Sequence, residues 1–199
     1  MSFFTGTTKM VNISPIPTTA GEGGPMITKD AAVALLHDHN FFLHCDPHYV
    51  SHRALPPQNP DANANANPET AKKEYQLPRD LDPLGSPAVK LYEVVDHVPN
   101  PVWSSSVVSK EEVVNFKDGL WVRIRSPLSV VMETRWSIKE AEEGEEGEGL
   151  QLVEEVDLSC SKLLISMVKA QVENNWKGIH GKIVDRLVAD AKKKAAESK

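Results

Sequence analysis

Five of the seven histidines lie close together in the chain, in a stretch whose side chains are of the types that bind transition metals. The stretch HDHNFFLHCDPHYVSH, residues 37–52, also holds Cys45 and acidic residues. Metal ligands must converge on one point with a geometry that suits the ion. Here the histidines straddle the expected end of a helix, Pro47 and a strand, with no known ligand spacing. We therefore expect no metal and no cofactor, and interpret these histidines as surface and helix-capping residues.

A carboxylate in an otherwise apolar row is the second feature that could do chemistry. In GLQLVEEVDLS, residues 149–159, strict alternation places Glu154 in the row of Leu150, Leu152, Val156 and Leu158. Burial without a partner would be costly, so a hydrogen-bond donor is expected nearby, with His180, Ser104 and Ser106 as candidates. If alternation fails, Glu154 is a solvated strand position. No nucleophile paired with a base can be assembled, so we name no catalytic residue.

The elements that must position these residues begin with a strand at TGTTKMVNI, residues 5–13. Thr28 is a candidate N-cap for the first of two short helices, which end at Pro47. A second strand follows at HYVSHRAL, residues 48–55. The sequence therefore places two short helices between its first two strands.

Five further strands are expected after residue 88, where β-branched and aromatic residues are frequent. They cover residues 89–98, 103–116, 119–126, 130–139 and 149–159. The tripeptide KDG at residues 117–119 is a tight hairpin signal, and Pro127 separates the next two strands. An antiparallel meander is the expected topology.

Alternation along these strands predicts one apolar face and one solvated face. The apolar row holds Leu120, Val122 and Ile124 on one strand and Val130, Met132, Thr134, Trp136 and Ile138 on the next. The opposite row of the first of these strands holds Trp121, Arg123 and Arg125, which we expect to be solvated.

A long C-terminal helix is expected to cover the apolar face. Its apolar stripe consists of Val168, Val172, Trp176, Ile179, Ile183 and Leu187. His180 lies at the edge of this stripe. Gly178 and Gly181 fall on the far side, so we expect them to allow curvature of the helix rather than close contact with the sheet.

Two segments interrupt this pattern. Residues 56–87 contain many prolines and the low-complexity run DANANANPET, which predicts a disordered insertion. Residues 140–149 are rich in glutamate and glycine, which predicts a flexible acidic loop between two strands. We expect the whole chain, residues 1–199, to form one domain around these segments.

Composition excludes several classes of function. The formal charge of −6 and the pI near 5.7 argue against nucleic-acid binding, which requires a basic surface. Cys45 and Cys160 have no disulfide-framework spacing and are expected to be reduced. No window approaches the roughly 20 apolar residues that span a bilayer, so we expect a cytoplasmic protein without a transmembrane segment. The oligomeric state does not follow from the sequence.

The order of elements resembles the START-like helix-grip superfamily, which includes polyketide cyclases and lipid-transfer domains. The segments LYEVVDHVPNPVWSSSV, GLWVRIRSPLSVVMETRW and NNWKGIHGKIVDRL are also similar to a fungal family of uncharacterised proteins in that superfamily. The resemblance implies an α+β fold in which a curved antiparallel sheet wraps around the long C-terminal helix. It also implies an apolar cavity between sheet and helix.

We therefore expect the protein to bind an apolar small molecule or lipid in that cavity. The expected ligand-binding residues are Trp103, Met132, Thr134, Trp136, Glu154, Trp176 and His180. Two alternatives stay open. One is a cyclase-like or aromatase-like enzyme that uses inward polar residues as acid or base, and the other is a protein-interaction module whose cavity has closed.

Overall fold

The protein is an α+β structure with one strongly curved antiparallel sheet. The computed structural model describes residues 5–56, 67–98, 105–141 and 149–198. The seven strands lie in the order β1-β7-β6-β5-β4-β3-β2. Their bounds are β1 Thr5–Ile16, β2 Tyr49–Leu55, β3 Lys90–Val98, β4 Ser105–Phe116, β5 Gly119–Ser126, β6 Val130–Glu140 and β7 Leu150–Ser161. The expected antiparallel meander of the last five strands is confirmed.

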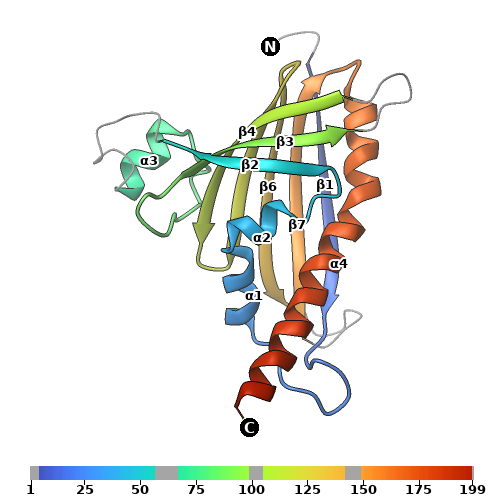
Figure 1. Ribbon diagram of the computed structural model, residues 1–199. Coiled ribbons are helices and arrows are strands. Elements are labelled where there is room, and N and C mark those ends of the chain that lie inside the picture. Colours follow the sequence, from blue (N-terminus) through green and yellow to red (C-terminus); the bar gives the residue numbers. More distant parts are fainter. Residues whose placement is uncertain (1–4, 57–66, 99–104, 142–148, 199) are drawn as a thin grey trace.

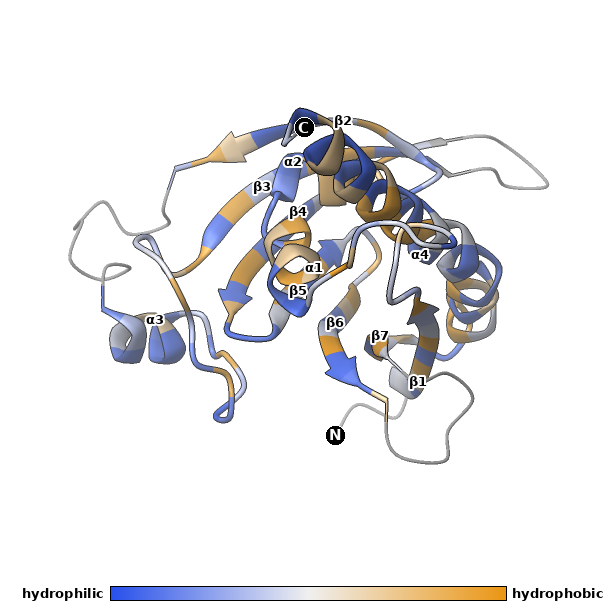
Figure 2. Cartoon of the chain, turned by 90° about the horizontal axis from the view of Figure 1, so that it is seen from below, coloured by the Kyte–Doolittle hydropathy of each residue, from blue (hydrophilic) through white to orange (hydrophobic). Residues whose placement is uncertain are grey.

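Four helices accompany the sheet within the described residues: α1 Lys29–Leu36, α2 His39–Leu43, α3 Pro68–Glu74 and α4 Ile165–Glu197. The helices α1, α2 and α4 lie on the concave side of the sheet, and α3 lies outside it (Figures 1 and 2). Thr28 caps α1 as predicted, because its hydroxyl accepts a hydrogen bond from the Ala31 amide at 3.2 Å. Asp38 caps α2 in the same way.

The main hydrophobic core fills one end of the concave side. There α1 packs between the sheet and the C-terminal half of α4. The fully buried members of this core include Leu36, Leu120, Val122, Ile138, Leu152 and Ile183. The predicted apolar rows of β5, β6 and β7 therefore do face the helices.

A second core lies on the convex side, where the sequence predicted solvent. It joins Ala71, Tyr75, Leu77 and Leu81 to Val89, Leu91, Val114 and Trp121. The prediction of a solvated row is wrong for Trp121 and Arg123, which are only 2% and 5% exposed. The reason is that residues 67–89 cover this face instead of projecting into solvent.

Arg123 holds that covering segment in place. Its guanidinium donates to the carbonyls of Tyr75 at 2.6 Å and Gln76 at 2.9 Å, where the chain turns after α3. It also pairs with Glu112 at 2.8 Å and Glu133 at 2.8 Å. These bonds replace the hydration that a buried guanidinium loses.

The two predicted breaks in the chain have different outcomes. The sequence predicts a disordered insertion at residues 56–87, but residues 67–87 include α3 and buried side chains of the convex core. Residues 57–66 and 142–148 lie outside the described residues, and most of the acidic loop falls in the second range. At the base of that loop the amide of Ala141 donates to the carbonyl of Gly149 at 2.8 Å.

Candidate functional site

The long helix α4 is buried along only part of its length. Its buried residues are His180, Ile183 and Leu187, all from the middle of the helix onward. The predicted stripe continues through Val168, Val172 and Trp176, but these side chains are only half-buried. The N-terminal half of α4 therefore keeps apolar surface within reach of solvent.

The concave face of the sheet also changes from buried to half-buried apolar side chains along its length. Met10, Ile124 and Met132 point toward the helices and are half-buried, whereas Trp136 and Ile138 further along β6 are buried. Neither Met10 nor Met132 belongs to the main hydrophobic core, and Val168, Val172 and Trp176 do not either. Ile124 packs against the edge of the main core, but the other apolar side chains of this part of the sheet and of α4 belong to neither core.

Glu154 lies at the boundary between the filled end and this half-exposed apolar surface. Strict alternation holds along β7, and Glu154 is 4% exposed among apolar neighbours. Asn12 donates to its carboxylate at 2.8 Å from the adjacent strand β1. His180 Nε2 lies 3.6 Å from the same oxygen, too far for a hydrogen bond and close enough for an ion pair when the imidazole is protonated.

His180 is the most enclosed polar side chain of this group, with 1% exposure. Its Nδ1 is hydrogen-bonded to the Ser14 hydroxyl at 2.8 Å. Its Nε2 has no hydrogen-bond partner among the described residues. A buried nitrogen without a partner costs free energy, and such groups are common where a ligand or water completes the site.

Aromatic rings enclose this imidazole. The Trp136 and Trp176 rings lie 5.3 Å and 5.2 Å from that of His180, centroid to centroid. Phe42 of α2 packs edge-on against Trp136 at 5.2 Å. The Trp136 indole donates to the Thr134 hydroxyl at 3.0 Å, which satisfies both groups.

The structure thus brings together four of the residues expected to bind ligand: Trp136, Glu154, Trp176 and His180. Thr134 supports Trp136, and Met132 lies two residues further along the same face of β6. Trp103 lies outside the described residues, as does Ser104.

Sequence reasoning missed the donor to Glu154. Ser106 is exposed and does not approach it, whereas Asn12 is its direct register partner. Alternation along β1 would have indicated that Asn12 points inward, because Met10, Asn12 and Ser14 share the inward row.

A second buried carboxylate on the concave face was also missed. Glu111 of β4 is 6% exposed, and burial raises its pKa to about 8, with further repulsion from the Asp96 and Asp46 carboxylates. Burial likewise raises the pKa of Asp96 to about 6. Alternation would have found Glu111, which shares its row with Ser109 and Val113.

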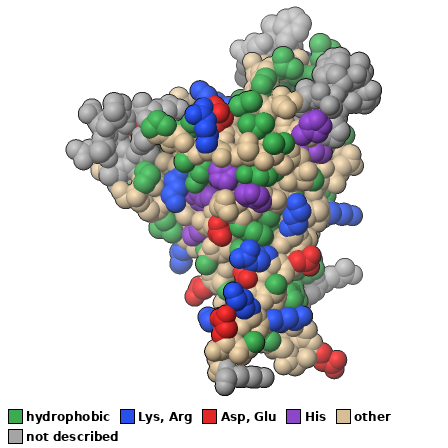
Figure 3. All heavy atoms as spheres, in the orientation of Figure 1, with side chains coloured by type: hydrophobic (Ala, Val, Ile, Leu, Met, Phe, Trp, Pro, Cys, Tyr) green, Lys and Arg blue, Asp and Glu red, His purple; other side chains and the backbone are tan. Residues whose placement is uncertain are grey.

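The predicted capping and surface histidines divide into two kinds. His39 is buried, donates from Nε2 to Asn115 at 2.7 Å and accepts at Nδ1 from the Tyr92 hydroxyl at 3.0 Å. Burial lowers its pKa. His44 and His52 pack around Tyr49, and histidines form a visible group on the face shown in Figure 3. Within the described part of the chain, no three His, Cys, Asp or Glu side chains are arranged to hold a metal ion.

A curved antiparallel sheet closed by a long C-terminal helix defines the helix-grip class, and this chain has that fold. Within that class the chain belongs to the family described as Domain of unknown function (DUF7053), whose model matches residues 5–193. No curated protein matches it at a significant level.

A solved structure supports the fold independently. The protein TTHA0849 from Thermus thermophilus aligns over 94% of this chain and 99% of its own, with a TM-score of 0.50 and 14% sequence identity. Likeness at this identity shows the fold alone. Among the described residues, no helix is long and apolar enough to cross a membrane.

Proposed function

We propose that the protein binds an apolar small molecule or lipid between the sheet and the N-terminal half of α4. The observation that supports this is the change from buried to half-exposed apolar side chains along both surfaces. Ile183 on α4 and Ile138 on β6 are fully buried, whereas Val172 and Met132 on the same two elements are not. Covering this apolar surface with a ligand would contribute roughly 25 cal/mol to the binding free energy for each Å² of apolar surface removed from water.

Glu154 and His180 give this surface a polar end. Asn12 occupies one hydrogen-bonding position of the carboxylate, and His180 Nε2 still lacks a partner among the described residues. The half-buried ring of Trp176 lies against His180, so its displacement would open the site. A ligand hydroxyl or carbonyl placed there would supply the missing bond. The favoured ligand is therefore mainly apolar with one polar group.

The test combines native mass spectrometry of the purified protein, to detect co-purified lipid, with a titration of delipidated protein by a fluorescent fatty-acid analogue. Glu154→Gln should preserve the fold and weaken binding or change selectivity. Glu154→Leu should stabilise the empty protein and abolish recognition of the polar group. Glu155→Gln is the matched control, because Glu155 points to the opposite face of β7 and pairs with Lys139 at 3.1 Å.

Equal binding by the wild type and both Glu154 variants would remove Glu154 as the anchor. Absence of binding to the wild type would remove the proposed function itself.

A second candidate is an enzyme of the cyclase or aromatase kind. The favouring observation is the chain of polar contacts from Ser14 to His180 and on to Glu154, at 2.8 Å and 3.6 Å. A histidine held between a hydroxyl and a carboxylate can transfer protons. Turnover of a polyketide-like substrate that His180→Gln abolishes, with binding retained, would favour the enzyme over the binding protein.

A further inference from the structure

The end of the molecule at which α4 begins carries three large apolar side chains in solvent. Leu128 lies in the turn between β5 and β6, Leu163 in the turn between β7 and α4, and Met167 in the first turn of α4. Their exposed fractions are 74%, 92% and 46%. Single exposed apolar residues are common in proteins, but a group of them at one place marks an interaction surface. We call these three residues the apolar tip.

The two turns leave the sheet at the same end. The strands β6 and β7 are adjacent, and Val131 pairs with Ser159. The turn that precedes Val130 therefore lies beside the turn that follows Ser161, and Figure 1 shows both at the upper end of the molecule. Because adjacent strands are only about 4.8 Å apart, the side chains of the apolar tip belong to one surface.

The backbone of the turn between β5 and β6 is not one that favours leucine. Leu128 and Ser129 both have a positive φ, 60° and 58°, a conformation that glycine and asparagine adopt more readily than leucine. With Leu128 mostly in solvent, little packing offsets this strain. Strained residues of this kind cluster at functional sites. The stability of the turn therefore does not explain a leucine at this position.

The charge around the apolar tip is positive, although the whole chain carries a formal charge of −6. Residues 125–132 and 159–172 contain Arg125, Lys162 and Lys169 and no aspartate or glutamate. Lys162 is exposed, and it has no ion-pair partner within the part of the chain that the structure describes. The N-terminus of α4, which is the positive end of its dipole, lies at the same place.

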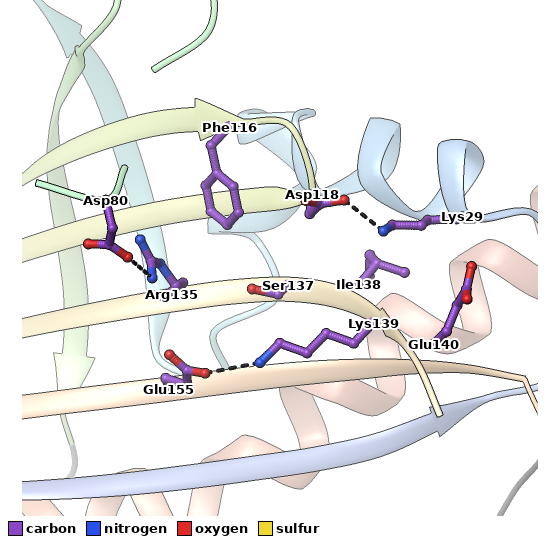
Figure 4. Close-up of a pocket in the computed structure, with 10 residues that line it drawn as sticks. All are labelled: Lys29, Asp80, Phe116, Asp118, Arg135, Ser137, Ile138, Lys139, Glu140 and Glu155. Carbon is purple, nitrogen blue, oxygen red and sulfur yellow. Dashed lines mark hydrogen bonds and ion pairs between the residues drawn. The ribbon is translucent and has the colours of Figure 1, made fainter. Parts of the chain in front are cut away.

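A groove on the convex face offers a contrast, because its charges are balanced within the protein. Each of its three cations pairs with a carboxylate: Lys29 with Asp118 at 2.6 Å, Arg135 with Asp80 at 2.6 Å, and Lys139 with Glu155 at 3.1 Å (Figure 4). Lys162 beside the apolar tip is instead free to pair with an anion from outside the chain.

Apolar side chains next to unpaired cations suit the surface of a lipid bilayer. Leucine and methionine side chains enter the boundary between headgroups and acyl chains, while lysine and arginine pair with anionic headgroups. A second copy of this chain fits less well, because a symmetric contact would bring Lys162 and its neighbours against their own like charges.

We propose that the apolar tip docks the protein on an anionic lipid bilayer. Leu128, Leu163 and Met167 enter the headgroup region, and Lys162 contacts the anionic headgroups. The docking does not depend on whether the concave face binds a lipid.

The experiment is co-sedimentation of the full chain with two kinds of vesicle, one of phosphatidylcholine alone and one of phosphatidylcholine and phosphatidylserine. The partition coefficient should be about fivefold higher on the mixed vesicles, and added salt should remove this difference. A wild type that does not bind the mixed vesicles overturns the proposal. Equal partitioning onto both kinds of vesicle overturns it as well.

Two variants separate the apolar contribution from the electrostatic one. Leu163→Ser should lower the partition coefficient about tenfold on both kinds of vesicle, because one leucine side chain no longer leaves water. Lys162→Gln should remove only the preference for phosphatidylserine. Met26→Ser is the matched control, since Met26 is 75% exposed but follows β1 at the opposite end of the sheet, and it should leave binding unchanged.

A third variant separates docking from stability. Leu128→Gly should weaken vesicle binding without lowering the melting temperature, because glycine adopts the positive φ of this turn readily. Unchanged binding by both Leu128→Gly and Leu163→Ser would overturn the proposal, and so would an equal loss of binding in Met26→Ser.

Sedimentation without lipid tests the competing occupant of the apolar tip. The wild type and Leu163→Ser should have the same mass in solution. A wild-type dimer that Leu163→Ser dissociates would assign the apolar tip to a second copy of the chain and overturn the proposal.

Discussion

Glu111 and Glu112 are neighbours on β4 and equally buried at 6% exposure, yet they lie on opposite faces of the sheet in opposite environments. On the concave face burial raises the pKa of Glu111 to about 8, and its charged neighbours are carboxylates. On the convex face the Glu112 carboxylate forms ion pairs with Arg123 at 2.8 Å and with Arg125 at 3.1 Å. At these two positions, therefore, the concave face disfavours the charged carboxylate, whereas the convex face pairs it with arginine.

The convex face should be the more sensitive to loss of a charge. Arg123→Met leaves Glu112 buried beside an apolar side chain and frees the carbonyls of Tyr75 and Gln76. We expect a loss of about 3–5 kcal/mol in the free energy of unfolding, measured by urea denaturation. Arg125→Met is the control, since Arg125 is half-exposed and makes one of these contacts, and it should cost less than about 1 kcal/mol. Similar losses in both variants would show that burial of the guanidinium does not determine its contribution to the free energy of unfolding.

The concave face should instead gain from loss of a charge. Because the folded-state pKa of Glu111 is raised to about 8 from an ordinary value of 4.5, the folded protein prefers the protonated form. Its stabilisation is complete below pH 4.5 and is lost as the pH rises from there to 8. Glu111→Gln should therefore raise the free energy of unfolding by about 2–4 kcal/mol at about pH 8 and leave it unchanged at about pH 4.

Thermal unfolding across this pH range measures the effect of Glu111→Gln. Glu74→Gln, which changes an exposed carboxylate on α3, should show no such pH dependence. A destabilised Glu111→Gln at high pH would mean that the ionised carboxylate has a partner.

The smallest effect is expected on the side of α4 that faces away from the sheet. A Cβ added at Gly178 or Gly181 meets no atom within 4 Å. Each change to alanine should raise the free energy of unfolding by up to about 1 kcal/mol, because glycine loses more backbone entropy on folding than alanine does. Gly119→Ala is the contrasting control, since its Cβ would collide with the Trp136 carbonyl, and it should destabilise strongly. Destabilisation by Gly178→Ala would contradict an open outer face.

Much of the concave face could be predicted because its pattern is local. Strict alternation along β7 is enough to place Glu154 among buried apolar residues, and the 3.6-residue period places Ile183 and Leu187 on the covered side of α4. The pairing of Glu154 with Asn12 was not predicted, because it joins the first strand to the seventh and depends on register between distant segments.

The convex face was less predictable because its cover comes from a segment with few apolar residues. Ala71, Tyr75, Leu77 and Leu81 are spread among prolines and charged residues, so no helical or strand period marks them as core. Their burial depends on Arg123, a residue type that usually indicates solvent.

Coverage on both faces has a kinetic consequence for the central strand β5. Residues 119–123 are buried on either side, by α1 beneath them and by the segment 67–89 above. β5 is also hydrogen-bonded through its backbone to β4 on one side and to β6 on the other. Local fluctuations therefore give water no access to its amide protons. Hydrogen–deuterium exchange there should require unfolding of the whole chain, whereas the edge strand β1, with Val11 61% exposed, should exchange by local opening.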